Sequence, residues 1–371
     1  MIATGLLVFF AVCLLIQLIY HLVFFSRLAF YKGGNDAPTT HSEGVSIVVC
    51  THNAAENLNT LLPALYAQDY PDFEVIVVND RSTDETFPFL VKEKEKVENL
   101  KVLTIDQTPS HIDPKKYAIT LGIKAAKHDL ILFTDSDCMP ASNLWVKTMA
   151  EPFANPSVDI TIGYSPYRAH PGLLNLFIRY ETLYTAIQYI SFALAGSPYM
   201  GVGRNMAYRK RLFLENKGFS GYQKITGGDD DIFINKHATR TNTRVRIGSD
   251  SIVYSLPKTT WKEYFRQKKR HLSVGKFYKF GDRLRLGILF VSQIGFWFSL
   301  IALLCMWHEP YFVIGGFVLR VLIQYIIYYK ADRMLGDKFK TWLTPLLDVL
   351  YVMYYIGTGI SAVASRNIKW N

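Results

Sequence analysis

Long apolar runs at both ends of the chain constrain its fold more than any other feature. The first, Gly5–Phe25, carries no charge and is long enough to cross a bilayer as a helix. No basic segment precedes it and no small-residue cleavage site follows, so we expect an uncleaved anchor over residues 1–28. Three similar runs predict about three C-terminal transmembrane helices within residues 284–371; they are Leu286–Trp307, Tyr311–Tyr329 and Trp342–Ala364.

The formal net charge of +10 is concentrated beside these runs. Lysine and arginine near membrane spans mark the cytoplasmic side, so the region between the first two runs is expected in the cytoplasm, and no nucleic acid is expected as a partner. Four spans would place Arg366 and Lys369 on the non-cytoplasmic side, against the charge rule. Either one C-terminal segment is re-entrant, or the number of spans is odd and not even. The four scattered cysteines form neither a disulfide framework nor zinc spacing.

The polar middle of the chain alternates short apolar runs with helix-like stretches. Residues 29–44 contain a linker rich in Pro, Asn, Thr and Gly. Strands that are apolar along their whole length, separated by helices, indicate an α/β fold with a mostly parallel sheet flanked by helices. The strands are predicted at 45–51, 73–80, 100–106 and 129–137, and the helices at 54–68, 84–97 and 115–126.

Polar residues just past these strands are the first candidates for a binding site, because ligands of parallel sheets bind at the carboxyl ends of strands. Thr51, Asn53, Asp80, Asp135 and Asp137 lie at such positions. Asp80 alone could equally belong to a strand-to-helix turn. No GxGxxG segment follows the first strand, which argues against dinucleotide binding of that kind.

Asp135 and Asp137 are the sharper signal, because two carboxylates at the end of a buried strand suit a hard divalent cation with a nucleotide diphosphate. Lys115 and Lys116 begin the preceding helix. Either lysine could belong to a solvated face, or one could reach the nucleotide.

Three consecutive aspartates, Asp229–Asp231, follow Gly227 and Gly228. Three readings are open: a solvated helix start, a metal site, or a base that takes a proton from a substrate. Two other segments are also ambiguous. Met200–Phe213 is glycine-rich and forms a ligand-contacting loop or a simple turn. Leu173–Leu194 is a core helix or a helix at the membrane surface.

Residues 258–283 form a basic, aromatic segment just before the second apolar run. Trp261, Tyr264 and Phe265 share one helical face, which is typical of an interfacial helix. Its arginines could also neutralise a pyrophosphate through paired hydrogen bonds. The two readings are compatible.

Taken in order, these motifs resemble those of the membrane-bound glycosyltransferases of family 2, which have a GT-A catalytic fold. The resemblance covers roughly residues 45–275, and the catalytic domain is expected over 45–257. The family pattern has an aspartate after the second strand, an Asp-x-Asp, a Glu-Asp or Gly-Asp-Asp, and a Gln-x-x-Arg-Trp. The matching residues are Asp80, Asp135-Ser136-Asp137, Gly228-Asp229-Asp230 and Gln267-Lys268-Lys269-Arg270-His271, with Thr51, Asn53 and Glu56 after the first strand.

The resemblance implies a role for each of these groups. Asp80 would contact the nucleotide together with Thr51, Asn53, Glu56 and Lys115. Asp135 and Asp137 would hold Mg²⁺ or Mn²⁺ on the donor diphosphate, and Gln267 and Arg270 would close over the pyrophosphate. Asp229 would be the general base, with Asp230 the close contender, and Asp231 would serve the first turn of the following helix. His271 stands where tryptophan is usual, which argues against polymer synthesis.

We therefore predict an inverting hexosyltransferase that uses a nucleotide-sugar, a UDP-sugar foremost, and a lipid or membrane-linked acceptor. It is expected in a bacterial inner membrane with a cytoplasmic catalytic domain. The alternative is a processive polysaccharide synthase of the cellulose or hyaluronan type. A non-catalytic scaffold is disfavoured by the complete aspartate set, and a transporter by the position of the polar sites outside the spans.

Overall fold

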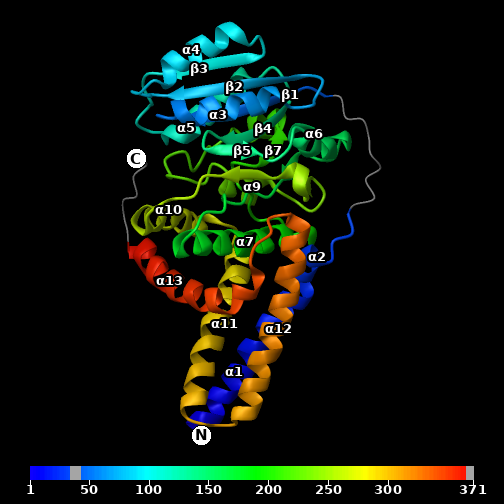
Figure 1. The fold of residues 1–371 in the computed structure, drawn as a ribbon, viewed down its shortest axis with the longest axis vertical. Coiled ribbons are helices and arrows are strands. Elements are labelled where there is room, and N and C mark those ends of the chain that lie inside the picture. Colours follow the sequence, from blue (N-terminus) through cyan, green and yellow to red (C-terminus); the bar gives the residue numbers. More distant parts are fainter. Residues whose placement is uncertain (34–42, 365–371) are drawn as a thin grey trace.

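The computed structural model describes residues 1–33 and 43–364. Most of the predicted linker 29–44 and the basic residues Arg366 and Lys369 lie outside the described residues. Figure 1 shows an α/β domain built around a central sheet, joined to a narrower bundle of long helices.

A seven-stranded sheet confirms the predicted α/β fold. Its strand order is β3-β2-β1-β4-β7-β6-β8, and the four strands on the β3 side are parallel. β7 runs antiparallel to both β4 and β6. The strands are β1 (Val45–Thr51), β2 (Phe73–Asp80), β3 (Leu100–Ile105), β4 (Leu130–Asp135), β6 (Ile160–Ile162), β7 (Met206–Arg209) and β8 (Thr243–Val245), and a separate pair joins β5 (Cys138–Pro140) and β9 (Val253–Ser255).

Helices cover both faces of this sheet, and the alternation of side chains along β1 shows why the strands are apolar throughout. Ile47 and Val49 pack with the helices of one face, whereas Val48 packs with α5 on the other. The first face carries α3 (Ala55–Tyr66), α4 (Thr86–Lys96) and α6 (Trp145–Ala150); the second carries α5 (Pro114–Ala125).

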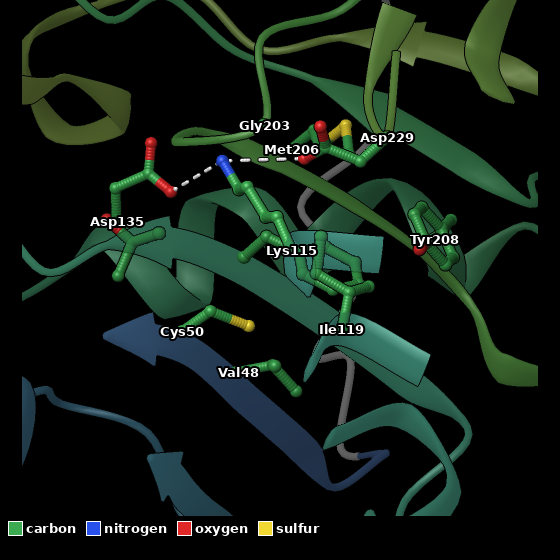
Figure 2. A pocket seen from close by; sticks show the side chains of 11 residues that line it. Val48, Cys50, Lys115, Ile119, Asp135, Gly203, Met206, Tyr208 and Asp229 are labelled. Carbon is green, nitrogen blue, oxygen red and sulfur yellow. Dashed lines mark hydrogen bonds and ion pairs between the residues drawn. The ribbon is translucent and has the colours of Figure 1, made fainter. Parts of the chain in front are cut away.

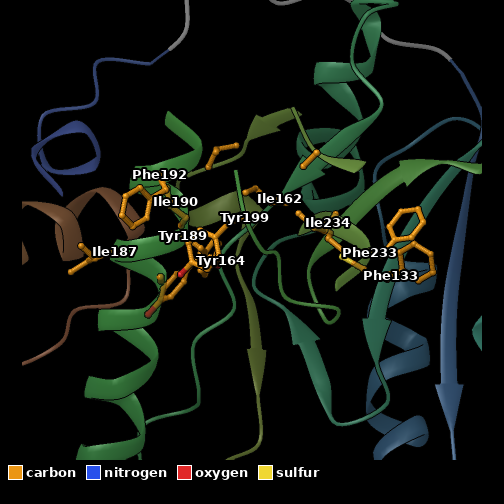
Figure 3. Packing of buried hydrophobic residues seen from close by; sticks show 14 of the residues in the cluster. Phe133, Ile162, Tyr164, Ile187, Tyr189, Ile190, Phe192, Tyr199, Phe233 and Ile234 are labelled. Atoms are coloured by element: carbon orange, nitrogen blue, oxygen red, sulfur yellow. The ribbon is translucent and has the colours of Figure 1, made fainter. Parts of the chain in front are cut away.

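The core on the α5 side continues into α7 (Leu173–Leu194), the segment whose sequence left two readings open. Figure 3 shows Ile187, Tyr189 and Ile190 of α7 among the buried residues of this core. The helix is therefore a core helix, lying between the sheet and the membrane bundle (Figure 1). Three shorter helices complete the domain: α8 (Lys210–Glu215), α9 (Asp231–His237) and α10 (Trp261–Val274).

Three helices in the described part of the chain are long and apolar enough to cross a membrane. They are the N-terminal helix Ile2–Ala29, which comprises α1 (Ile2–Ile19), η1 (Tyr20–Phe25) and α2 (Ser26–Ala29), together with α11 (Phe280–Cys305) and α12 (Pro310–Leu335). In Figure 1 the N-terminus and the α11–α12 turn lie at the end of the bundle far from the sheet, so α12 returns toward the catalytic domain.

The third C-terminal run, expected as a span, forms α13 (Thr344–Ala364); among the described residues it is not one of the helices that are long and apolar enough to cross a membrane. This helix lies across the bundle in Figure 1 and packs against α10 and α7. The reason is polar: Asp348 of α13 is fully buried and bonds residues of α7, α11 and α12. Among the described residues, two C-terminal helices are candidate spans, α11 and α12, and the end of α12 lies on the side of the sheet in Figure 1.

The carboxylate of Asp348 is the centre of this polar network. It accepts hydrogen bonds from Arg320 at 2.8 Å, Trp297 at 2.8 Å and Gln293 at 2.6 Å. Arg320 is 1% exposed, so both charges are removed from solvent. Buried charges are tolerated when they are paired and hydrogen-bonded, and this pair joins α12 to α13.

We predict that Arg320→Met destabilises the protein by about 3–5 kcal/mol, because it leaves the buried Asp348 carboxylate without its charge partner. Thermal unfolding in detergent measures the effect, with the exposed Arg333→Met on the same helix as the control. The double variant Arg320→Met/Asp348→Leu should recover part of the loss. A double variant no more stable than Arg320→Met would contradict this account.

Candidate active site

The carboxyl ends of β1, β2 and β4 meet at one edge of the sheet and bring together residues far apart in sequence. Thr51 pairs in register with Asn79, and Cys50 with Asp135. The side-chain oxygens of Thr51 and Asn79 are buried there and have no hydrogen-bond partner in the structure. Buried polar atoms normally find partners, so this edge suits a polar ligand.

Lys115 is the charge at the centre of this edge. Its Nζ lies 3.2 Å from Oδ1 of Asp135 and 3.4 Å from Oδ2 of Asp229, as Figure 2 shows. Burial opposes its charge, but the carboxylates of Asp135, Asp229 and Asp230 hold the pKa of Lys115 well above its usual value. The ammonium group therefore stays charged between the two carboxylates.

A small cavity opens beside this ion bridge. Three of its lining residues, Lys115, Asp135 and Asp229, were predicted from sequence as site residues. The rest of the lining is mostly apolar and comes from β1, α5, β4 and β7 and the loop before β7; it comprises Val48, Cys50, Ile119, Phe133, Thr134, Gly203, Met206 and Tyr208. The cavity thus joins the strand ends to the loop that carries the three aspartates.

The three aspartates have different surroundings, and Asp229 is the one that faces the cavity. It is 5% exposed. Burial alone would raise its pKa, but the cations of Lys115 and Lys116 outweigh burial and lower it below the usual value. Asp229 is therefore ionised at neutral pH.

Asp230 and Asp231 are engaged in structural hydrogen bonds. Asp230 accepts from the backbone N–H groups of Gly203 at 2.8 Å and of Asp231 at 2.7 Å, and caps α9. Asp231 accepts the Tyr278 hydroxyl at 2.7 Å. Burial and the neighbouring carboxylates raise the pKa of both. The predicted role of Asp231 in the first turn of α9 was incomplete, because Tyr278 is 47 residues away and only the fold brings it near.

The turn before these aspartates requires glycine. Gly227 and Gly228 have φ of +81° and +76°, which L side chains rarely adopt. A Cβ on Gly228 would lie 2.4 Å from Cδ1 of Ile232. The two glycines therefore permit the tight turn that brings Asp229 to the cavity.

Lys116 differs from its neighbour Lys115 and is not part of a solvated face. It is fully buried, and its ammonium donates to the backbone carbonyls of Ile225 and Gly227. Its contacts fix the loop just before Asp229 to the start of α5. Sequence spacing offers no signal for this contact, because the partners are backbone atoms more than 100 residues away.

The Asp-x-Asp motif forms a cluster that fits a hard cation. Oxygens of Asp135 and Asp137 and the sulfur of Cys138 lie within 4.8 Å of one another. Two carboxylates at the end of a strand suit a hard cation such as Mg²⁺ or Mn²⁺, which prefers oxygen ligands.

Asp80, Asn53 and Glu56 lie outside the cavity lining. Asp80 forms an ion pair with Arg81 at 2.7 Å. Asn53 joins the loops after β1 and β2, since its side chain accepts from the backbone N–H of Thr83 at 2.8 Å. Glu56 is exposed on the first turn of α3. The structure thus gives Asn53 a structural contact, whereas the nucleotide-binding role of all three stays a prediction.

The predicted interfacial helix is α10, and it lies over the aspartate loop. A Cβ on Gly227 would lie 3.8 Å from Cγ of Arg270 and 3.3 Å from Val274. Gln267 donates to the Tyr167 hydroxyl at 3.3 Å.

Lys268 faces the opposite way and attaches α10 to the core. Its ammonium forms an ion pair with the buried carboxylate of Glu181 on α7. Tyr264 and Tyr355 donate to the same carboxylate at 3.2 Å and 2.8 Å. Glu181 therefore determines how α10 presents Gln267 and Arg270, although its place in an apolar helix gave no sign of this role.

Comparisons with known proteins agree with this fold. The sequence model of glycosyl transferase family 2 matches residues 46–215. The poly(ribitol-phosphate) beta-N-acetylglucosaminyltransferase TarS of Staphylococcus aureus is 37% identical over 94 residues, which are 25% of this chain and 16% of TarS. The probable glycosyltransferase YdaM of Bacillus subtilis is 25% identical over 236 residues, which are 61% of this chain and 54% of YdaM. The matches thus span little more than half of these relatives at most.

A solved structure supports the architecture over the whole chain. The mannosyltransferase PcManGT from Pyrobaculum calidifontis, in complex with GDP-Man and Mn²⁺, has a TM-score of 0.67 to this protein at 18% identity. The alignment covers 99% of this chain and 100% of that chain. With the family match and the sheet described above, residues 46–215 belong to glycosyl transferase family 2 and form the central part of a GT-A fold, on a chain with three candidate membrane spans.

Proposed function

We propose that this protein is an inverting hexosyltransferase that moves a sugar from a nucleotide-sugar, a UDP-sugar foremost, to a hydroxyl group of a lipid or membrane-linked acceptor. One observation carries the proposal: the ionised carboxylate of Asp229 lies in a cavity at the strand ends, joined through Lys115 to the metal-binding motif at Asp135. Base, metal ligand and cation are the three parts that sugar transfer requires.

The reaction forms one bond and breaks another at the anomeric carbon. The acceptor oxygen bonds to that carbon, while the bond from the carbon to the diphosphate oxygen breaks and its electron pair leaves with the diphosphate. Asp229 takes the proton of the acceptor hydroxyl as general base. A single displacement with one base inverts the anomeric centre, and Asp230 is less suited because its oxygens already accept two backbone N–H groups.

The leaving diphosphate gathers negative charge, which the site is built to offset. Asp135 and Asp137 would hold Mg²⁺ or Mn²⁺, which supplies positive charge to the phosphate oxygens when bound. Lys115 lies beside Asp135, and Arg270 lies on the helix above Asp229. The Mn²⁺ and GDP-Man in the structure of PcManGT support a cation and a nucleotide-sugar in this fold.

The surroundings of α10 support an acceptor at the membrane surface. Trp261 and Phe265 are 46% and 37% exposed on this helix, next to the basic residues Lys262 and Arg266. Exposed aromatic and basic residues on one helix suit the interface of a bilayer. With two candidate C-terminal spans in the described part of the chain, we favour a glycolipid product over a long polysaccharide, whose synthesis is the alternative and would require a translocation channel.

Replacing the base should abolish most activity without unfolding the protein. We expect Asp229→Asn to lower turnover about a hundredfold to ten-thousandfold, the usual contribution of a general base. Release of nucleoside diphosphate from a panel of nucleotide-sugars with Mg²⁺ or Mn²⁺ measures it, and the exposed Asp250→Asn is the matched control. Near-normal turnover in both Asp229→Asn and Asp230→Asn would show that neither is the base.

The pH profile tests the ion bridge. Asp229 must be ionised, so activity is lost as pH falls through its pKa, which Lys115 helps to lower. Lys115→Met removes that cation and raises the pKa, so the acidic limb of kcat/KM should move to higher pH. An unmoved limb, or one at lower pH, would exclude this role of Lys115.

The product distinguishes the two kinds of acceptor. Membranes containing the protein, incubated with radiolabelled nucleotide-sugar, should yield a single organic-soluble product that migrates as a glycolipid. Membranes containing Asp229→Asn are the control. A labelled product of high molecular mass would favour the polysaccharide synthase instead.

A further inference from the structure

Arg204 belongs to the glycine-rich segment Met200–Phe213, and the proposed function leaves it without a role. Its guanidinium is held by three hydrogen bonds. Nε donates to Oγ of Ser165 at 2.8 Å, Nη2 to the backbone carbonyl of Ser165 at 2.8 Å, and Nη1 to the Tyr167 hydroxyl at 3.3 Å. It also lies 4.6 Å from the centre of the Tyr167 ring. The side chain is therefore fixed in one orientation.

The three acceptors that hold Arg204 are neutral oxygens. A guanidinium has five N–H donors, and these bonds use three of them, so two remain for a ligand. Arg204 is half-buried and Tyr167 is 3% exposed, so the charge is partly removed from water. None of its direct hydrogen-bond partners among the described residues is an anion, so an anionic ligand would add a charge-assisted hydrogen bond that the fold itself does not make.

The position of Arg204 indicates which anion it would bind. Gly203, the residue before it, lines the cavity with Asp135 and Asp229 (Figure 2). In the antiparallel pair of β4 and β7, Phe133 pairs with Met206, so the chain at Asp135, two residues after Phe133, runs beside the chain at Arg204, two residues before Met206. Arg204 thus lies near the two carboxylates that would hold the cation.

On its other side, Arg204 is linked to α10. The Tyr167 hydroxyl that accepts from Arg204 also accepts from Gln267, the first residue of the Gln-x-x-Arg motif. The carbonyl oxygen of the Gln267 side chain is buried and has no partner in the structure. The side chains of Arg204 and Gln267 therefore meet at Tyr167, and each has a hydrogen-bonding atom that a ligand could use.

We propose that Arg204 binds the diphosphate of the nucleotide-sugar donor, positioned by Ser165 and Tyr167. A guanidinium matches two oxygens of a phosphate with paired N–H donors. As the bond from the anomeric carbon to the diphosphate oxygen breaks, the electron pair goes to that oxygen, and Arg204 stabilises the added charge. This inference rests on the proposed function, because it assigns part of the donor site.

Binding of nucleotides without turnover tests the assignment. The full-length protein in detergent is titrated by calorimetry, in the presence of Mn²⁺, with UDP and GDP and with uridine and guanosine. The variants are Arg204→Met and Arg204→Lys. The matched control is Arg244→Met on β8, because Arg244 is also held by neutral backbone oxygens, those of Thr241 and Thr243.

We expect Arg204→Met to weaken binding of the preferred nucleoside diphosphate about tenfold or more, and to leave binding of the matching nucleoside within twofold. Arg204→Lys should bind with intermediate affinity, and Arg244→Met like the wild type. Thermal unfolding confirms that each variant is folded. Equal loss of nucleoside and nucleoside diphosphate binding in Arg204→Met would overturn a specific diphosphate contact.

Two further outcomes separate the assignment from the proposed function. If the wild type binds nucleoside diphosphate and folded Arg204→Met binds it equally well, the assignment is wrong while the proposed function stands. If Arg204→Met keeps its affinity for nucleoside diphosphate and raises only the KM for the acceptor, the guanidinium faces an anionic acceptor and not the donor. If the wild type binds no nucleoside diphosphate, the donor site itself is refuted, and the assignment with it.

Discussion

The ion bridge from Asp135 through Lys115 to Asp229 is the interaction on which the site depends. It joins the end of β4, the start of α5 and the loop before α9, three segments that share no local sequence. A buried carboxylate is costly unless a cation or hydrogen bonds compensate its charge. Because Lys115 supplies that charge, Asp229 stays ionised inside the protein, where a base is useful. Lys116 completes the arrangement by fixing the backbone of the same loop.

The catalytic edge is also tied directly to the membrane helices. On α9, Asp231 accepts from Tyr278, and Asn235 donates to Asp282 of α11 at 2.8 Å. The helix that follows the candidate base is therefore held against the start of a membrane span. On the other side, the Glu181–Lys268 pair attaches α10 to α7, which packs on α12 and α13. These contacts hold the candidate site against the bundle of long helices.

Much of the architecture could be predicted from local patterns. The strands 45–51 and 73–80 match β1 and β2 residue for residue, because strands buried on both faces are apolar throughout and end in polar residues. Asp135 lies at the edge where ligands of parallel sheets bind because it ends a parallel strand, whereas Lys115 reaches the same cavity from the start of α5 and Asp229 from the loop before α9. Hydropathy alone was less reliable for α13, an apolar helix that a buried aspartate holds across the bundle.

The residues whose roles only the fold revealed have partners distant in sequence. Lys116 meets backbone carbonyls, Asp231 meets a tyrosine just before α11, and Arg204 meets a serine and a tyrosine from a different loop. The amino-acid sequence by itself determined the sheet, the apolar spans and the set of acidic residues, because periodicity and composition act over a few neighbouring residues. Only the tertiary structure decided which aspartate faces the cavity and which cations surround it, because charges interact through space and not along the chain.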